Sequence, residues 1–255
     1  AVKIAEDFAT LDVLSHGRAE IMAGRGVEPE TYAHYGQDAS KSQDMLQEAI
    51  GLLRTLWTED VVHWTGAFRP PLEGVTLQPR PIQDPHPPIW VAPGSLESAL
   101  RAGEQGLCIA ITPAACGLPT MEKMISAYRE AWVSAGHPGQ GRVAASAHVY
   151  VGDGKEDALE YFKAYHVPFQ KWVFSLRTGG DPATLELPPH TQDFTGPDAV
   201  PMAGEPAYIK ERCLAWKERF GLDRLIVQFD HAGQPWNKVM GSLRRFSEHV
   251  LEDLR

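Results

Sequence analysis

Apolar residues follow two kinds of pattern along the chain: short continuous runs, and longer stretches with helical spacing. The run VAASAHVYV, from Val143 to Val151, is almost wholly apolar, which is typical of a strand buried on both faces. Between Ser40 and Thr58, by contrast, apolar residues recur every three or four positions, which predicts an amphipathic helix. Core strands are predicted in this way at 18–24, 89–92, 107–112, 143–151 and 224–230.

Helical segments separate these strands. They are predicted near the start of the chain and at 40–58, 96–105, 121–135, 155–177, 205–220 and 236–254. Strands that alternate with helices of this length form parallel sheets with right-handed crossovers. The pattern therefore predicts an α/β fold with about five core parallel strands, organised as a single domain of residues 1–255.

Two segments interrupt this alternation. Residues 61–88 are rich in proline, glycine and aromatic residues, and they predict a hairpin around Gly66. Residues 179–204 are rich in proline and glycine and show no clear period. We therefore expect the second segment to form a long loop or a lid.

The charge balance narrows the class of partner. The formal net charge of −9 and the isoelectric point near 5.6 argue against binding to nucleic acid or to an anionic membrane, because both require a basic surface. No apolar stretch approaches the roughly 20 residues of a membrane span. The first residues have an amphipathic helix pattern and do not resemble a signal peptide, so we expect a cytoplasmic protein.

Cysteines and histidines form no recognisable metal or disulfide motif. Cys108, Cys116 and Cys213 are far apart and make no CxxC pair, so neither a zinc site nor a disulfide framework is predicted. The ten histidines are scattered, without an HExxH or HxH motif. No metal site is therefore predicted.

The turn Gly24-Arg25-Gly26, directly after a predicted strand, has the composition of an anion site. Its glycines permit close approach or unusual dihedral angles, and its arginine offers a forked, permanently charged donor to phosphate. The alternative is an arginine on a solvated turn whose glycines serve only the bend.

The turn Pro93-Gly94-Ser95 leads from a predicted strand directly into a predicted helix. Free N–H groups and the positive end of the helix dipole favour an anion there, and Gly94 lets a ligand approach the backbone. Ser95 equally suits the role of a simple N-cap, and the two roles are compatible.

Other polar and aromatic residues near predicted strand ends are weaker candidates. Tyr32, His34 and Tyr35, in the stretch YAHYG, either flank a ring-shaped ligand or only pack the loop. His148 is a polar residue in an apolar strand, where a hydrogen-bonded core role is commoner than a catalytic one.

The last predicted strand ends in QFDHAG, which places three polar residues at the same end of the sheet. Gln228, Asp230 and His231 are candidates for contact with a substrate or cofactor. Asp230 has the alternative role of capping the final helix.

Three stretches together resemble the bacterial luciferase-like family of flavin-dependent oxidoreductases. They include AEDFATLDVLSHGRAEIMAGRG at residues 5–26, LWTED and QPRPIQDPHPPIWVAPGS within 48–106, and the segment 224–255 that begins RLIVQFDHAG. The resemblance implies a (β/α)8 TIM barrel. It also implies that three further strand–helix units normally precede the segment where this chain starts.

The resemblance further implies that FMN, or the related deazaflavin, lies across the C-terminal mouth of the barrel. Residues 24–26 and 93–95 would then form the two halves of a phosphate clamp, with Tyr35 as a further cofactor contact. Family members also form dimers, so a homodimer is expected.

The function implied by this resemblance is an FMN-dependent monooxygenase that acts on a small organic substrate with oxygen, with reduced flavin supplied by a reductase partner. One alternative is hydride transfer with a deazaflavin. Another is a non-catalytic flavin-binding or partner-subunit homologue. No catalytic acid or base is assigned, because in the family the first strands supply residues of that kind.

Overall fold

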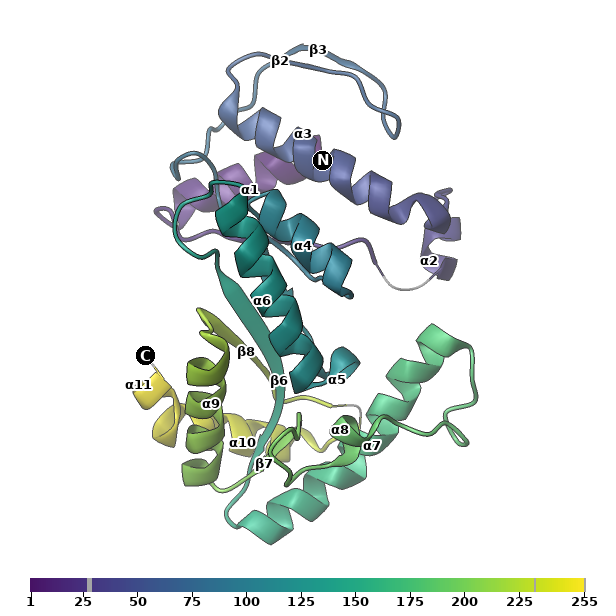
Figure 1. The fold of residues 1–255 in the computed structure, drawn as a ribbon, viewed down its shortest axis with the longest axis vertical. Helices are drawn as coiled ribbons and strands as arrows, with labels where there is room; N and C mark the ends of the chain where they lie inside the picture. Colours follow the sequence, from purple (N-terminus) through teal and green to yellow (C-terminus); the bar gives the residue numbers. More distant parts are fainter. Residues whose placement is uncertain (27–28, 232, 255) are drawn as a thin grey trace. The chain divides into compact units, whose positions relative to one another are not determined.

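The computed structural model describes residues 1–26, 29–231 and 233–254 (Figure 1). The chain divides into two compact units, Ala1–Ala92 and Pro93–Arg255. The expectation of a single domain stays a prediction.

The first unit contains two long helices that pack on each other, several shorter elements and a short parallel strand pair. Its elements are α1 (Val2–Leu14), β1 (Ile21–Ala23), α2 (Pro29–His34), the 3-10 helix η1 (Ala39–Lys41), α3 (Ser42–Thr58), β2 (Val62–Trp64), β3 (Leu72–Val75) and β4 (Ile89–Val91). Trp57 of α3 is buried, and its indole N–H donates to the Ala5 carbonyl of α1 at 3.0 Å. β1 and β4 pair in parallel, with Ala23 opposite Val91.

A buried carboxylate holds the segment that leads into β4. Asp12 is fully buried, and its Oδ2 accepts the backbone N–H groups of Ile82 and Gln83 at 2.8 and 2.9 Å. A buried carboxylate needs such donors to offset its desolvation. These bonds fix the loop that delivers the chain to the second strand of the pair.

The hairpin predicted around Gly66 is confirmed. β2 and β3 pair in antiparallel fashion, and Gly66 lies in the connection between them. Glu48 of α3 accepts the backbone N–H groups of Ala67 and Phe68 at 2.6 and 3.1 Å. The hairpin is therefore held to the helix that precedes it.

The second unit is built around one long strand. Its elements are α4 (Leu96–Glu104), β5 (Cys108–Ile111), α5 (Pro113–Cys116), α6 (Leu118–Ser134), β6 (Val143–Val151), α7 (Lys155–Thr178), α8 (Pro189–Gln192), β7 (Met202–Gly204), α9 (Pro206–Phe220), β8 (Arg224–Gln228), α10 (Trp236–His249) and α11 (Leu251–Leu254). β6 pairs in parallel with β5, β7 and β8. Eight of its nine residues are buried, as expected of a central parallel strand.

Helix α4 packs closely on α6, and a glycine permits the approach. A Cβ atom at Gly103 would lie 2.4 Å from the Tyr128 carbonyl oxygen, which a side chain could not tolerate. The position therefore requires glycine for helix packing rather than for a turn. This contact holds α4 in place directly after the turn at residues 93–95.

All five predicted core strands are confirmed as β1, β4, β5, β6 and β8. The segment 179–204 differs from its prediction, because it contains α8 and β7 instead of being irregular throughout. From Leu187 onward the segment is packed, since Leu187, Phe194 and Val200 are buried and β7 pairs with β6. A three-residue strand next to Pro201 is too short to show a period.

The helix ends also differ in two places. α6 begins at Leu118 rather than Met121, because a proline at its first turn already has a helical φ and needs no hydrogen-bond partner for its nitrogen. The predicted final helix breaks at Val250, so that α10 and α11 are separate.

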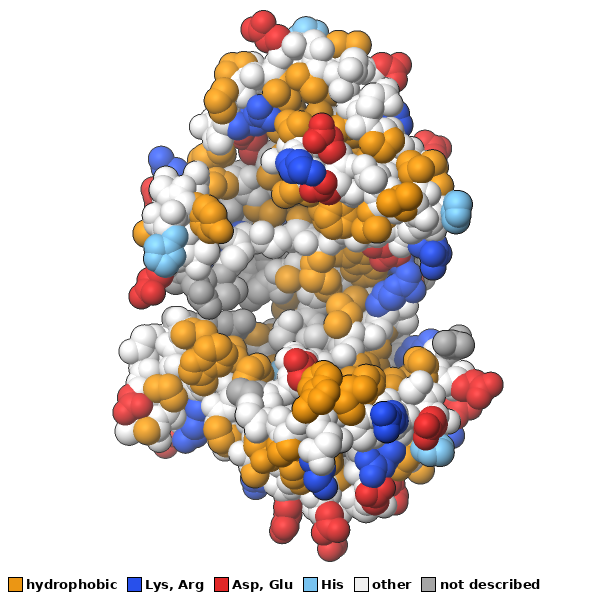
Figure 2. All heavy atoms as spheres, turned by 180° about the vertical axis from the view of Figure 1, so that it is seen from behind, with side chains coloured by type: hydrophobic (Ala, Val, Ile, Leu, Met, Phe, Trp, Pro, Cys, Tyr) orange, Lys and Arg blue, Asp and Glu red, His pale blue; other side chains and the backbone are white. Residues whose placement is uncertain are grey.

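Large apolar side chains reach the surface in both units (Figure 2). In the first unit Met22 of β1 is 52% exposed, and in the second Ile226 of β8 is 43% exposed and Trp236 of α10 is 70% exposed. Among the described residues, no helix combines the length and apolar character needed to cross a bilayer.

Candidate functional site

The chain leaves β1 through the turn Gly24-Arg25-Gly26. Gly26 has a φ of +81°, in the left-handed region that favours glycine, whereas a side chain at Gly24 would meet nothing within 4 Å. Arg25 is exposed and its guanidinium donates one long hydrogen bond, 3.3 Å, to the Ser42 hydroxyl. Among the described residues, this is the one hydrogen bond of the Arg25 side chain, so its other donors suit an anion.

The turn Pro93-Gly94-Ser95 leads directly into α4. Ser95 is the N-cap of this helix: its hydroxyl accepts the Ser98 N–H at 3.2 Å, and the Ser98 hydroxyl accepts the Ser95 N–H at 3.0 Å. The predicted cap is thus confirmed as a reciprocal capping box. A side chain at Gly94 would meet nothing within 4 Å, so the backbone there is open to a ligand.

Phosphate binding by these two turns stays a prediction. They belong to different units of the chain, Ala1–Ala92 and Pro93–Arg255. Each turn by itself has features of an anion site: an exposed arginine between glycines in one, and a helix N-terminus with an open glycine in the other.

The aromatic candidates after Arg25 divide between the two alternatives. Tyr32 packs on the turn, because a Cβ atom at Gly26 would lie 3.6 Å from its hydroxyl oxygen. Tyr35, by contrast, is 77% exposed, and His34 at the end of α2 is exposed as well. Tyr32 therefore fits the loop-packing role, whereas Tyr35 and His34 remain candidates for a ligand contact.

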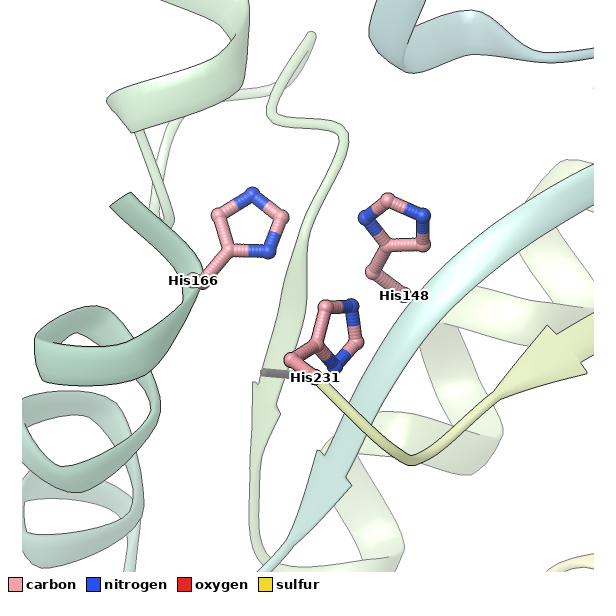
Figure 3. A group of neighbouring side chains, drawn as sticks. All are labelled: His148, His166 and His231. Carbon is pink, nitrogen blue, oxygen red and sulfur yellow. The ribbon is translucent and has the colours of Figure 1, made fainter. Parts of the chain in front are cut away.

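Three histidines come together in the second unit. His148 lies on β6, His166 on α7 and His231 in the loop after β8, and the three rings face one another (Figure 3). The ring centroids of His148 and His231 are 4.6 Å apart, and His166 lies 5.3 and 5.4 Å from them. We call these residues the histidine cluster.

The sheet register and one helix face assemble this cluster. His148 is paired with Gln228 at the end of β8, so the loop that follows carries His231 back over the same end of the sheet. On α7, Phe162, His166 and Gln170 are spaced four residues apart and share a face. Gln170 Nε2 donates to His148 Nδ1 at 3.0 Å, which joins α7 to β6.

All three imidazoles are buried, and burial lowers their pKa values. The pKa falls from 6.5 to about 3 for His148, to about 2 for His166 and to about 4 for His231, chiefly through desolvation of the charged form. Neighbouring histidines lower the pKa of His148 and His166 further. Hydrogen-bonding contacts with the backbone of Thr191 and of Phe229 partly oppose the lowering of the pKa at His166 and His231, although neither contact has the geometry of a full hydrogen bond.

These values make the cluster a set of neutral imidazoles at neutral pH. A neutral imidazole has one nitrogen with a free electron pair, which can accept a proton or bind a metal ion. The cluster is therefore unsuited to attracting an anion by charge, and suited to acting as a nitrogen ligand set.

The sequence indicated two of these three histidines. His148 is buried with one hydrogen bond, as the core interpretation expects, and His231 lies at the strand end as predicted. His166 was not indicated, because nothing in the local sequence distinguishes it from a packing residue of a long helix.

The remaining residues at this strand end make local contacts. Gln228 Nε2 donates to the Asp230 carbonyl at 2.9 Å, and the Asp230 side chain is exposed. Asp230 does not cap the final helix: the N-cap of α10 is Pro235, with no side-chain cap bond. That alternative for Asp230 is wrong because the loop after β8 continues for several residues before the helix begins.

Comparison with known proteins identifies relatives of the chain. A family model described as luciferase-like monooxygenase matches residues 1–224. The oxygenase component of a flavin-dependent trigonelline monooxygenase from Acinetobacter baylyi is 31% identical over 263 residues, which cover 98% of this chain and 71% of that protein.

Solved structures with the same fold include three oxidoreductases. Monooxygenase RslO1 from Streptomyces bottropensis superimposes with a TM-score of 0.82 at 24% identity, over 100% of this chain and 74% of that one. The oxygenating constituent of 3,6-diketocamphane monooxygenase from Pseudomonas putida, in complex with FMN, gives 0.73 at 22% identity over 99% and 76%. An F420-dependent secondary alcohol dehydrogenase with an F420–acetone adduct gives 0.75 at 20% identity over 100% and 75%.

These structures share the luciferase-like TIM-barrel fold, as the motifs implied. The family match extends from the first residue into β8, and it includes both turns at residues 24–26 and 93–95. The chain therefore belongs to the luciferase-like monooxygenase family.

Proposed function

We propose that the protein is an FMN-dependent monooxygenase that acts on a small organic substrate with molecular oxygen. The observation that carries the proposal is its likeness to the oxygenase component of trigonelline monooxygenase, which covers nearly the whole of this chain. The chain spans about seven tenths of the length of that relative.

The residues present fit a bound flavin phosphate. Arg25 supplies a forked cationic donor. The next residue, Gly26, has a positive φ and no side chain, so this residue does not cover the turn. At the second turn, the Ser95 hydroxyl accepts the Ser98 N–H, whereas the N–H groups of Leu96 and Glu97 have no carbonyl partner within the helix. Glu97 of the first turn pairs with Arg101 at 2.6 Å, which offsets its repulsion of an anion.

The division of labour follows from the cofactor. Reduced flavin supplies the electrons and the chemistry of oxygen activation, while the protein anchors the phosphate and keeps water from the reacting ring. A relative named as an oxygenase component favours a separate reductase as the source of reduced flavin. Tyr35 and His34 are exposed in the segment that follows Arg25, and they are candidates for contacts to the ring or the substrate.

Flavin titration tests the proposal. We expect FMN to bind with quenching of its fluorescence, and the variant Arg25→Gln to bind it about 10- to 100-fold more weakly, the worth of a hydrogen bond to a charged group. Arg69→Gln is the matched control, because Arg69 lies in the β2–β3 connection and contacts the Pro70 carbonyl. Equal affinities for wild type and both variants would remove Arg25 from the cofactor site.

A second measurement separates an enzyme from a non-catalytic flavin binder. Reduced FMN, generated by an added flavin reductase, is mixed with oxygen and a panel of small carbonyl and aromatic compounds. We expect consumption of oxygen to yield an oxygenated product with at least one of them. Binding of FMN with no product from any compound would instead favour the partner-subunit alternative.

A deazaflavin-dependent hydride transfer is the second candidate. It is favoured by the likeness to the F420-dependent secondary alcohol dehydrogenase. Parallel titrations with FMN and with F420 distinguish the two candidates. A tighter complex with F420, together with F420 reduction by an alcohol in the absence of oxygen, would replace the monooxygenase proposal.

A further inference from the structure

We propose that the histidine cluster, His148, His166 and His231, binds a divalent transition-metal ion that takes nitrogen ligands, with Zn²⁺ as the reference ion. The candidate ligand atoms of the three side chains all lie within 4.8 Å of one another. The rings come from three separate elements and turn towards a common space (Figure 3). This site does not depend on the flavin function proposed above.

The unpaired nitrogens of the cluster are the first argument. His166 and His231 are 1% and 3% exposed, and among the described residues their four ring nitrogens make no hydrogen bond of normal geometry, only weak contacts with the backbone of Thr191 and of Phe229. A buried polar group without a partner costs about 1–3 kcal/mol. An ion that takes one electron pair from each ring reduces this cost, which no surrounding apolar side chain can do.

The second argument is the composition of the ligand set. Among the described residues the cluster contains histidines only, which is the donor set of Zn²⁺, Cu²⁺, Ni²⁺ and Co²⁺, whereas Mg²⁺ and Ca²⁺ take oxygen ligands. Metal ions bind the neutral form of imidazole. Burial already keeps all three rings in that form, because it lowers their pKa values well below neutrality.

Gln170 is the third argument, because it fixes which nitrogen of His148 has the free electron pair. Gln170 is buried, its amide Nε2 contacts His148 Nδ1 at 3.0 Å, and Nδ1 is the nitrogen of that ring that points toward the other two histidines (Figure 3). An amide N–H only donates, so Nδ1 carries the electron pair that an ion would take. The amide of Gln170 therefore holds His148 in the form that binds a metal, and it gives way when an ion takes its place.

The expected geometry is a three-histidine site with an open fourth position. Ligand nitrogens at about 2.0–2.1 Å from a tetrahedral Zn²⁺ lie about 3.4 Å apart, so the ion draws the three rings closer together. Bound metal would then tie α7 and the loop after β8 to strand β6.

Aromatic packing is the competing explanation for the cluster. The ring centroids of Phe162 and Phe169 lie 5.0 and 5.2 Å from that of His231, in edge-to-face orientations. If the histidines served only as flat packing groups, phenylalanine would replace them without loss. The variant His166→Phe keeps the ring and its packing but removes a ligand, so it separates the two explanations.

The test is metal binding by the protein after treatment with EDTA and dialysis. Zn²⁺ is titrated by calorimetry, and Co²⁺ is followed by its visible absorption. We expect one equivalent to bind, and His166→Phe to weaken binding by more than about 100-fold, beyond the usual loss from removal of a second-layer contact. Gln170→Leu leaves the three ligands in place and removes a hydrogen bond that competes with the ion, so it should bind Zn²⁺ at least as tightly as the wild type.

His190→Gln is the matched control. His190 is another partly buried histidine of the same unit, on α8, and it contacts the Ala114 carbonyl at 3.3 Å. Its replacement should leave metal affinity unchanged. The metal-free melting temperature of His166→Phe should equal or exceed that of the wild type, and His231→Phe, which also removes one ligand, serves in its place if His166→Phe does not fold.

Three results would overturn the proposal. One is the absence of saturable binding of Zn²⁺ or Co²⁺ by the wild type. Another is equal affinity in the wild type and His166→Phe. The third is a thiolate-to-cobalt absorption band, which would assign the ion to a cysteine such as the partly exposed Cys116.

Discussion

The phosphate turns and the histidine cluster present polar groups in opposite ways. The phosphate turns, residues 24–26 and 93–95, are short, largely exposed and made by neighbours in sequence. The histidine cluster is buried, and its members are separated by 18 and 65 residues along the chain. An exposed turn can bind a charged ligand with little change in stability, whereas a buried cluster affects folding itself, because desolvation acts on each of its groups.

Acid should reveal this difference most strongly. The pKa of each cluster histidine is lowered in the folded protein, so below pH 6.5 the unfolded chain takes up protons that the folded chain refuses. The stability that the three neutral imidazoles contribute is therefore fully present above pH 6.5. It is lost as the pH falls towards their folded-state pKa values of about 2 to 4. In EDTA, we expect each histidine to remove about 1.4 kcal/mol of unfolding free energy per pH unit between pH 6.5 and 4.5.

Urea unfolding at several pH values measures this slope. His166→Phe should reduce it by about a third, because one of the three titrating groups is gone. An unfolding free energy that is flat between pH 6.5 and 4.5 would contradict the burial of neutral imidazoles.

The second largest difference between the two regions is expected in the free energy of unfolding after truncation of an aromatic side chain. Phe162 is fully buried and packs on His166 and His231. Phe162→Ala should lower the free energy of unfolding by about 3–5 kcal/mol. Tyr35→Ala, in the segment that follows the turn at residues 24–26, should change it by less than about 0.5 kcal/mol, because Tyr35 is 77% exposed. Chemical denaturation of both variants checks the pair, and similar losses would show that the exposed loop is also held by packing.

The two glycines of the phosphate turns give a finer comparison. Gly26 has a φ of +81°, so Gly26→Ala should cost about 1–2 kcal/mol through backbone strain. Gly94 lies outside the left-handed region and a Cβ there meets nothing within 4 Å, so Gly94→Ala should change stability by less than about 0.5 kcal/mol. FMN affinity is measured in parallel. A loss of affinity in Gly94→Ala without loss of stability would assign the open backbone to the ligand.

The smallest effect is expected at the helix cap. Ser95→Ala removes the hydroxyl that accepts the Ser98 N–H, which should cost about 1 kcal/mol. Ser95→Gly should cost only a few tenths of a kcal/mol, because glycine is itself a good N-cap. If both variants bind FMN as tightly as the wild type, the hydroxyl serves the helix alone. A weaker complex in both would give it a second role at the phosphate.

Patterns that are local in sequence were sufficient to predict much of this protein. Apolar runs located all five core strands, and the cap at Ser95 and the hairpin around Gly66 followed from a few adjacent residues. The same holds for the family, because its motifs are continuous stretches on either side of the turns. Strand β7 escaped prediction because three residues cannot show a period, and their conformation depends on pairing with β6.

The histidine cluster was decided by tertiary structure alone. His148 and His231 come together because β6 and β8 pair with His148 opposite Gln228, and His166 joins them because one face of α7 packs on that strand end. Neither the register nor the helix orientation is encoded in the residues next to each histidine. The sequence by itself determined the core strands and most of the helices, and it marked two turns that have the composition of an anion site. Only the packing of these elements decided that three neutral imidazoles share one buried space.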